Sequence, residues 1–413
     1  MTFFDALKRE FSFIKGNYAV LVTSWILIDF AMEIPGTYYS LYVLGLGATE
    51  TVLGLIGFST FLALASLQFP GGYLADKFGR RWLVASMTFG VGLSFIIFAI
   101  APSWELILFG SVLMAIFNSI YQPALMAMIA DSLPSERRGM GFGIITLITS
   151  ASTTPGPVVA GVLRNSFGLM DGMRVAYGIV VVLFLIAAFL RLFKLKETML
   201  NVKRPSLKEI FSSYPISLKE SFGVWKKVPH ATFYLFLALI MITFGFSTTN
   251  LYLVVYAVRE LGIDEATWPL ILTALFITMI TVSIPMGKIV DKVNRKSPIL
   301  LSFILFGLSM WLFLNGNLIL LFVSLVLAGL AQVTIMSAVS ALQADLTPKE
   351  QRGKVGGFTN FASQICMAVG SFTGGFLYEH ISPRAPFYIA IFSILPAFLL
   401  TLFLVHEPEK REE

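Results

Sequence analysis

The sequence has few charged residues, one cysteine and three histidines. Asp, Glu, Lys and Arg make up 13% of its 413 residues, whereas hydrophobic residues make up 56%. A water-soluble fold of this length needs more polar surface, so the composition excludes a soluble globular protein. The single Cys366 excludes an intramolecular disulfide. The histidines are not grouped with cysteine or paired acids, and the phosphate-binding pattern G-x4-G-K-[ST] does not occur. We therefore predict no catalytic residues, no metal and no cofactor, and a protein that is not an enzyme.

Long hydrophobic segments recur along the whole chain. Most reach the roughly 20 residues that span a bilayer, and spans this apolar must pair their backbone groups internally as helices. They lie near residues 17–44, 50–77, 80–101, 104–132, 137–166, 172–194, 231–259, 265–292, 296–314, 317–346, 351–379 and 385–406. We predict an all-α polytopic membrane protein of twelve transmembrane helices in two pseudo-symmetric six-helix bundles. Its expected parts are an amphipathic segment (1–16), the first bundle (17–194), a cytoplasmic linker (195–229), the second bundle (230–406) and a cytoplasmic tail (407–413).

The formal charge of +6 is unevenly distributed. Most Lys and Arg fall in the loops of one face, and the opposite face carries little beyond Arg164, Arg174, Arg259 and Arg384. This asymmetry predicts that both termini lie in the cytoplasm. Because the bases are shared among short separate loops, they do not predict a nucleic-acid site. We expect a monomer that crosses the cell membrane many times.

The two halves repeat each other at an offset of 214 or 215 residues. Tyr38 and Tyr42 correspond to Tyr252 and Tyr256, and Asn118 corresponds to Gln332. The pattern D-x-x-P-x-E-x-R-G occurs at 131–139 and again at 345–353. An even number of spans in each half keeps both halves in the same orientation, as in transporters built from parallel repeats.

One charged loop also occurs twice. Gly72, Asp76, Gly79, Arg80 and Arg81 follow the pattern G-x-x-x-D-[RK]-x-G-[RK]-[RK], which resembles the loop signature of the major facilitator superfamily. The second copy keeps the acid and the bases but has Asn294 in place of the second glycine. The resemblance implies a charged latch that closes the cytoplasmic side, in which the acid faces a helix start of the other half. The alternative is that the bases only fix orientation. The candidate gating residues are Gly72, Asp76, Arg80, Arg81, Asp131, Arg138, Asp291, Arg295, Asp345 and Arg352.

Two acids, Asp29 and Glu33, lie in the middle part of the first span. Their i, i+4 spacing places them on one face of a helix. Carboxylates at that depth are costly unless they face a cavity or a partner, and no Lys or Arg in the middle of a span is evident to neutralise them. We therefore expect them to bind a proton or a cation, with Glu33 the better candidate because Pro35 follows it closely. The alternative is a protonated acid that is hydrogen-bonded to a hydroxyl.

The resemblance also implies that helices 1, 4, 7 and 10 line a central cavity. Acids among aromatic side chains would suit an amphipathic cation through charge pairing and cation–π contact, although each aromatic residue could equally serve in packing. Together with Asp29 and Glu33, the candidate proton- and substrate-binding residues are Tyr38, Asn118, Tyr121, Gln122, Asn250, Tyr252, Tyr256 and Gln332.

Small residues in the fifth span resemble the antiporter motif of drug–proton exchangers, although Ser152 and Ala160 replace two glycines. Such residues let helices approach closely. A similar set in the eleventh span makes ordinary packing the competing interpretation. The R-x-x-Q-G motif of that group is also absent, since Ser111, Met114 and Ala115 stand there. The candidate packing residues are Gly143, Gly156, Pro157, Gly161, Gly370, Gly374 and Gly375.

Three functions remain open from the sequence. The favoured one is a secondary active transporter that works by alternating access and exports a small amphipathic compound or drug in exchange for protons. The first alternative is proton-coupled uptake of a small solute such as a sugar or metabolite. The second is a membrane receptor or scaffold without transport, which would need neither buried acids in the first span nor a doubled gating loop.

Overall fold

A computed structural model describes residues 13–134, 137–199, 222–348 and 351–407, together with 209, 215 and 219. The predicted segment 1–16 lies mostly outside these residues, as do most of the linker and the tail. Every helix that crosses the molecule lies in one of two halves. The N half contains α2 (Gly16–Gly36), α3 (Tyr39–Gly45), α4 (Glu50–Lys77), α5 (Arg80–Ile100), α6 (Trp104–Asp131), α7 (Arg138–Thr153) and α8 (Gly156–Lys194). The C half contains α10 (His230–Asn250), α11 (Leu253–Arg259), α12 (Trp268–Lys292), α13 (Lys296–Leu314), α14 (Leu318–Leu346), α15 (Arg352–His380) and α16 (Ala385–Leu404).

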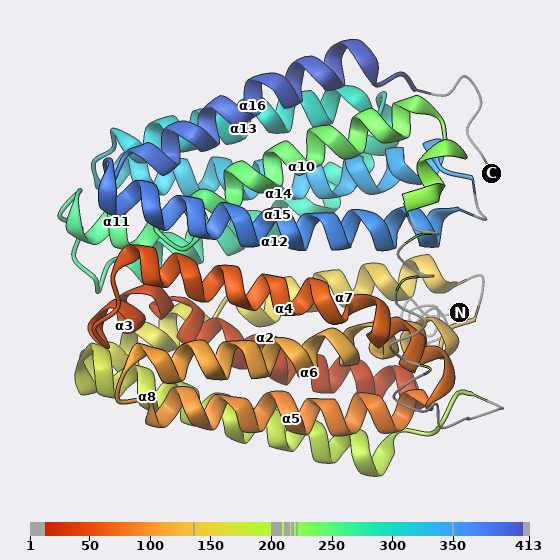
Figure 1. Cartoon of the computed structure of the whole chain (residues 1–413), viewed down its shortest axis with the longest axis horizontal. Coiled ribbons are helices and arrows are strands. Elements are labelled where there is room, and N and C mark those ends of the chain that lie inside the picture. Colours follow the sequence, from red (N-terminus) through yellow and green to blue (C-terminus); the bar gives the residue numbers. More distant parts are fainter. Residues whose placement is uncertain are drawn as a thin grey trace, which may run out of the picture.

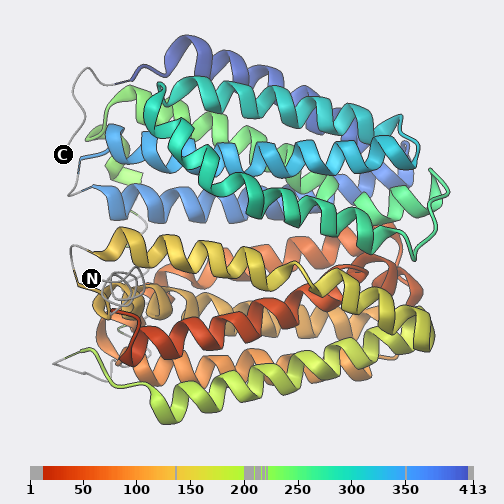
Figure 2. The ribbon, with the colours of Figure 1, turned by 180° about the vertical axis from the view of Figure 1, so that it is seen from behind.

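The two halves lie side by side, each a bundle of roughly parallel and antiparallel helices (Figure 1). They meet along two seams. On one side α4 packs against α15, and on the other α12 packs against α7 and α8, which Figure 2 shows from behind. A short 3-10 turn at Val224–Lys226 packs on α15. We call the end of the molecule where α4 ends at Lys77 and α6 ends at Asp131 the motif face, and the opposite end the α3/α11 face.

The predicted fold class is confirmed. In the described part of the chain, ten helical stretches are long and apolar enough to cross a membrane. One of them contains two spans, because α8 bends at Gly168, whose φ of 78° only glycine adopts readily. The remaining span, α15, is the eleventh along the chain and is 29 residues long, but it is more polar than the others.

The first and seventh spans differ from the sequence prediction because each is broken into two helices. Pro35 has no N–H to donate, and α2 ends at Gly36 before α3 begins at Tyr39. The break between α10 and α11 occurs without proline. There the Thr248 and Thr249 hydroxyls donate to the carbonyls of Gly245 and Phe246, and so compete with the main-chain ladder.

The buried tyrosines support the internal repeat. Tyr42 donates its hydroxyl proton to the main-chain oxygen of Phe98 at 2.8 Å, and the equivalent Tyr256 donates to that of Leu314 at 3.1 Å. Each tyrosine thereby ties a short helix, α3 or α11, to the end of α5 or α13 in its own half. The two bundles are therefore built by the same local contacts.

Candidate functional site

Glu33 lines a cavity of about 490 Å³ between the two halves. The cavity is bordered by the end of α2 and by α3, α10, α11, α12, α13 and α14. Asn250 and Gln332, two of the predicted binding residues, line it as well, among mainly apolar neighbours. Gly156 at the start of α8 packs directly on Glu33, since a Cβ there would lie 2.6 Å from the Glu33 Cβ. The close packing of α8 on Glu33 therefore holds the Glu33 side chain at the cavity.

Asp29 lies one turn before Glu33 but has different surroundings. Its Oδ1 accepts a hydrogen bond from the Trp25 indole at 3.0 Å, and it does not line the Glu33 cavity. Glu33 makes no comparable hydrogen bond to a described residue. The pair predicted from the sequence as one constellation thus divides into an acid at the cavity and an acid held within the N half.

A second cavity, of about 450 Å³, lies between α4, α6 and α15. Its lining carries no ionisable side chain but five amides: Gln68, Asn118, Gln122, Asn360 and Gln364. The side-chain amide oxygens of Asn118 and Gln364 are buried without a hydrogen-bond partner. The sequence predicted Asn118 and Gln122, and the structure adds the other three. Polar residues of α15, Asn360 and Gln364, thus line this cavity.

Tyr38, Tyr121, Tyr252 and Tyr256 line neither cavity. Tyr121 lies in the core of the N half under the guanidinium of Arg191. Tyr38 and Tyr252 instead join the halves at the α3/α11 face. Tyr38 donates to the main-chain oxygen of Glu265 at 2.7 Å, and Tyr252 donates to that of Glu50 at 3.3 Å. Each half therefore donates an equivalent hydrogen bond to the other, because Glu50 and Glu265 also correspond to each other in the repeat.

Ion pairs strengthen the same face. Arg164 of α8 binds Glu265 at 3.0 Å, and Arg259 of α11 binds Glu50 at 2.5 Å. Among the described residues, the ion pairs that join the two halves all lie here. Sequence reasoning missed these contacts, although the repeat offset that relates Glu50 to Glu265 was a usable signal. They close the α3/α11 face.

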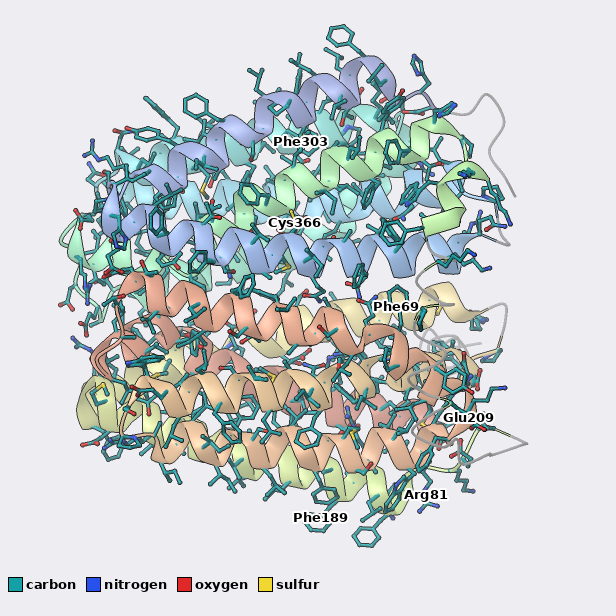
Figure 3. The ribbon with its side chains drawn as sticks, in the orientation of Figure 1. Phe69, Arg81, Phe189, Glu209, Phe303 and Cys366 are labelled. Atoms are coloured by element: carbon teal, nitrogen blue, oxygen red, sulfur yellow. The ribbon has the colours of Figure 1, made fainter. Side chains whose placement is uncertain are left out.

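At the motif face, the ion pairs between described residues stay within each half. Arg80 pairs with Asp131, and the repeat-equivalent Arg295 pairs with Asp345 at 3.4 Å. Arg81, labelled in Figure 3, donates to the main-chain oxygen of Leu192 at 2.9 Å. Each motif copy therefore stabilises its own half through an equivalent ion pair.

The other predicted gating residues have varied surroundings. Asp76 is exposed, with no ion pair to a described residue. Gly72 has open space around it. Arg352 donates to the main-chain oxygens of Thr347 and Ala344. The side chains of Arg138 and Asp291 are outside the described part of the structure.

Near the motif face, α4 and α15 hold the two halves in contact. Gln68 donates to the main-chain oxygen of Gly357 at 3.1 Å. Figure 3 shows Phe69 between these helices, where its ring lies 5.3 Å from that of Phe361. The halves are thus joined by ion pairs at the α3/α11 face and by contacts between α4 and α15 near the motif face.

The predicted packing residues lie at close helix approaches, with one exception. Gly370 and Gly374 pack on α10, Gly375 packs on Glu50 across the two halves, and Gly161 packs on Pro269 of α12. Pro157 is buried at the start of α8, whereas Gly143 has open space around it.

Sequence reasoning did not single out one buried base. Arg191, in the last turn of α8, is completely buried in the N half. Its guanidinium donates to Ser24 and Thr88 at 2.8 and 2.7 Å. A base so close to a span end resembles an interfacial anchor, and nothing in the sequence shows that the side chain turns inward.

Two pseudo-symmetric six-helix halves with cavities between them define a multi-pass membrane transporter, not an enzyme. The chain belongs to the Major Facilitator Superfamily, whose family model matches residues 21–269 and 235–413.

Relatives support the same class. The chain is 25% identical over 360 residues to an uncharacterized MFS-type transporter of Methanocaldococcus jannaschii, covering 86% of this chain and 90% of that protein. It is 30% identical over 179 residues to the quinolone resistance protein NorA of Staphylococcus aureus, but this match covers 43% of this chain and 46% of NorA.

Solved structures share the fold at low sequence identity. A POT family transporter crystallised with 5-aminolevulinic acid superposes with a TM-score of 0.73 at 13% identity, covering 94% of this chain and 95% of that chain. A bacterial homolog of the human lysosomal transporter Spinster, in an inward-facing and unoccupied conformation, superposes with a TM-score of 0.68 at 14% identity, covering 94% of both chains.

Proposed function

We propose that this transporter exports small amphipathic cations across the cell membrane in exchange for protons, as a monomer. The observation that carries the proposal is Glu33, a carboxylate at a mostly apolar cavity between the halves that forms no ion pair with a described residue. Such an acid is stable in a membrane when it holds a proton or a cationic ligand. A carboxylate that binds the two alternately couples their movement. The partial match to NorA supports export of a drug-like compound.

The orientation is part of the proposal. The motif face carries the basic loops and is therefore the cytoplasmic face, with both termini on that side. Charges and tyrosines join the halves at the α3/α11 face, whereas the described ion pairs of the motif face remain inside each half. This arrangement is that of a transporter closed to the outside. Alternating access then requires the α3/α11 contacts to break while the motif face closes.

Transport by purified protein in proteoliposomes tests the proposal, with ethidium as the fluorescent cationic probe. An imposed pH gradient is expected to drive ethidium against its concentration gradient, and a protonophore is expected to stop it. Liposomes without protein are the control. Ethidium movement that does not depend on the pH gradient would exclude proton exchange and indicate facilitated diffusion.

The amide-lined cavity favours a second candidate, proton-coupled uptake of a small polar solute. Five amides and no charge suit hydroxyl or amide groups better than a lipophilic cation. A thermal-shift screen of lipophilic cations, sugars and amino acids separates the two candidates, because a ligand stabilises the folded state by mass action. Stabilisation by sugars alone would favour uptake.

The charged loops give a prediction about gating. Asp76 has no described partner while the motif face is in this conformation, and we propose that it contacts a helix start of the C half when this face closes. Removing one charge-assisted contact costs about 1.5–3 kcal/mol, which shifts a balanced equilibrium by about tenfold or more. Asp76→Asn should therefore increase the labelling rate of a cysteine at position 360, measured in a Cys366→Ser background.

Asp291→Asn is the matched comparison for this experiment. We expect it to have a smaller effect on labelling and on transport, because the second loop has Asn294 where the first has Gly79. A larger effect from Asp291→Asn would show that the C half carries the main latch. Unchanged labelling in Asp76→Asn with normal transport would contradict the gating role.

A further inference from the structure

Arg191 is the most completely buried charged side chain in the described part of the protein. Its exposed fraction is 0%, and it lies inside the N half, away from both cavities. Its guanidinium contacts three helices. Nε donates to Ser24 of α2, Nη1 donates to Thr88 of α5, and the group lies 5.4 Å from the ring centre of Tyr121 of α6.

None of these contacts neutralises the positive charge. Ser24 and Thr88 offer neutral hydroxyls, and Tyr121 offers the face of its ring. The third guanidinium nitrogen, Nη2, is buried without a hydrogen-bond partner. A buried cation without an anionic partner is strongly unfavourable, because burial removes the water that would stabilise it. The site therefore calls for an anion that can come close during the transport cycle.

Asp29 is the acid that the fold brings to this site. It lies on α2, one turn beyond Ser24 and Trp25, and Trp25 holds its Oδ1. Arg191 binds this same helix through Ser24, a little more than one turn before Asp29. The neighbouring elements offer no other described acid at this point: α5 contributes Thr88, α6 contributes Tyr121, and Glu33 on α2 lies at the cavity.

We propose that Arg191 is a positioning residue for proton coupling: it pairs with Asp29 when this acid is ionised and thereby sets the pH at which Asp29 takes up a proton. When Asp29 is protonated, the guanidinium rests on Ser24, Thr88 and Tyr121, as it does here. The inference rests on the proposed proton coupling at α2, and it adds a residue from α8 to the machinery.

The competing role is structural, in which Arg191 only links α2, α5 and α6. That role depends on the hydrogen bonds to Ser24 and Thr88 and not on the protonation of Asp29. Loss of these bonds would lower stability without moving any titration. A measurement of titration therefore separates the two roles.

Trp25 supplies a reporter that needs no substrate, because its indole donates directly to Asp29. The experiment keeps Trp25 as the sole tryptophan and changes the other five to phenylalanine: Trp82, Trp104, Trp225, Trp268 and Trp311. Fluorescence of this purified protein is recorded against pH. Since a nearby cation favours the ionised carboxylate, Arg191→Gln should move the midpoint up by at least about one pH unit. Arg191→Lys keeps the charge and should stay close to the parent protein.

Asp29→Asn in the same background must remove the transition. A pH response that survives this change, or a midpoint unmoved by Arg191→Gln, overturns the proposal. If Arg191→Gln alone fails to fold, the double variant Arg191→Gln/Asp29→Asn decides. Recovery of monomeric yield and melting temperature by removal of both charges supports the pairing, and no recovery overturns it. Because the assay contains no substrate, it can succeed even where ethidium exchange fails.

Discussion

Glu33→Gln is expected to abolish transport driven by a proton gradient while leaving substrate exchange across the membrane within a few-fold of the parent rate. Glutamine has nearly the volume of a protonated glutamic acid but cannot release a proton. The Glu33 cavity would keep its shape, since Gly156 packs on the Cβ of residue 33 and not on its carboxylate oxygens. Loss of a proton-transferring group typically costs about 10²–10⁴-fold in rate, and here the loss should fall on the coupled step alone.

Paired assays in proteoliposomes measure this difference. One assay follows uphill ethidium movement after a pH jump, and the other follows exchange of labelled for unlabelled ethidium without a gradient. Glu105→Gln is a suitable control, because Glu105 is exposed at the start of α6, far from α2 in the chain and outside both cavities. Uphill transport by Glu33→Gln at the parent rate would mean that this carboxylate is structural.

Gly375→Val is expected to prevent closure of the α3/α11 face. A Cβ at Gly375 would collide with the main-chain oxygen of Glu50 and lie 2.6 Å from the Tyr252 hydroxyl. Main-chain atoms in a helix cannot move aside as a flexible side chain can, so α4 and α15 would have to separate. The variant should lose nearly all transport, since alternating access needs both faces to close.

Access to the cavity provides the readout. A cysteine at Asn250, in the Cys366→Ser background, should be labelled faster from the α3/α11 face in Gly375→Val than in the parent. Gly178→Val is the matched control, because Gly178 lies within α8 and has open space where its Cβ would be. Equal labelling and transport in Gly375→Val and its parent would show that the α4–α15 seam tolerates separation without opening.

The fold could be predicted from the sequence because the membrane restricts the possibilities so strongly. Apolar length defined the spans, and the repeat offset related the halves to each other. The break after Pro35 could be anticipated from the missing N–H, whereas the break between α10 and α11 depends on threonine hydroxyls whose direction no sequence pattern gives.

The site was harder to predict because its contacts cross between segments that are remote in the chain. Depth in an apolar span was enough to single out Glu33. Tyr38 and Tyr252 were recognised as equivalent and interpreted as cavity residues, but each is used to reach a main-chain oxygen of the other half. Arg191 was missed, since only the packing of α2, α5 and α6 around it reveals a buried charge.

The ion pairs of the α3/α11 face also make the protein sensitive to its surroundings. Arg259 and Asp264 are roughly half or more exposed in these pairs, so dissolved ions reach them. Electrostatic attraction at exposed sites weakens as salt shortens the Debye length, from about 10 Å at 0.1 M to about 3 Å at 1 M. The tyrosine contacts are buried and carry no net charge, so salt leaves them intact. High salt on that side of the membrane is therefore expected to shift the balance between conformations toward opening of the α3/α11 face.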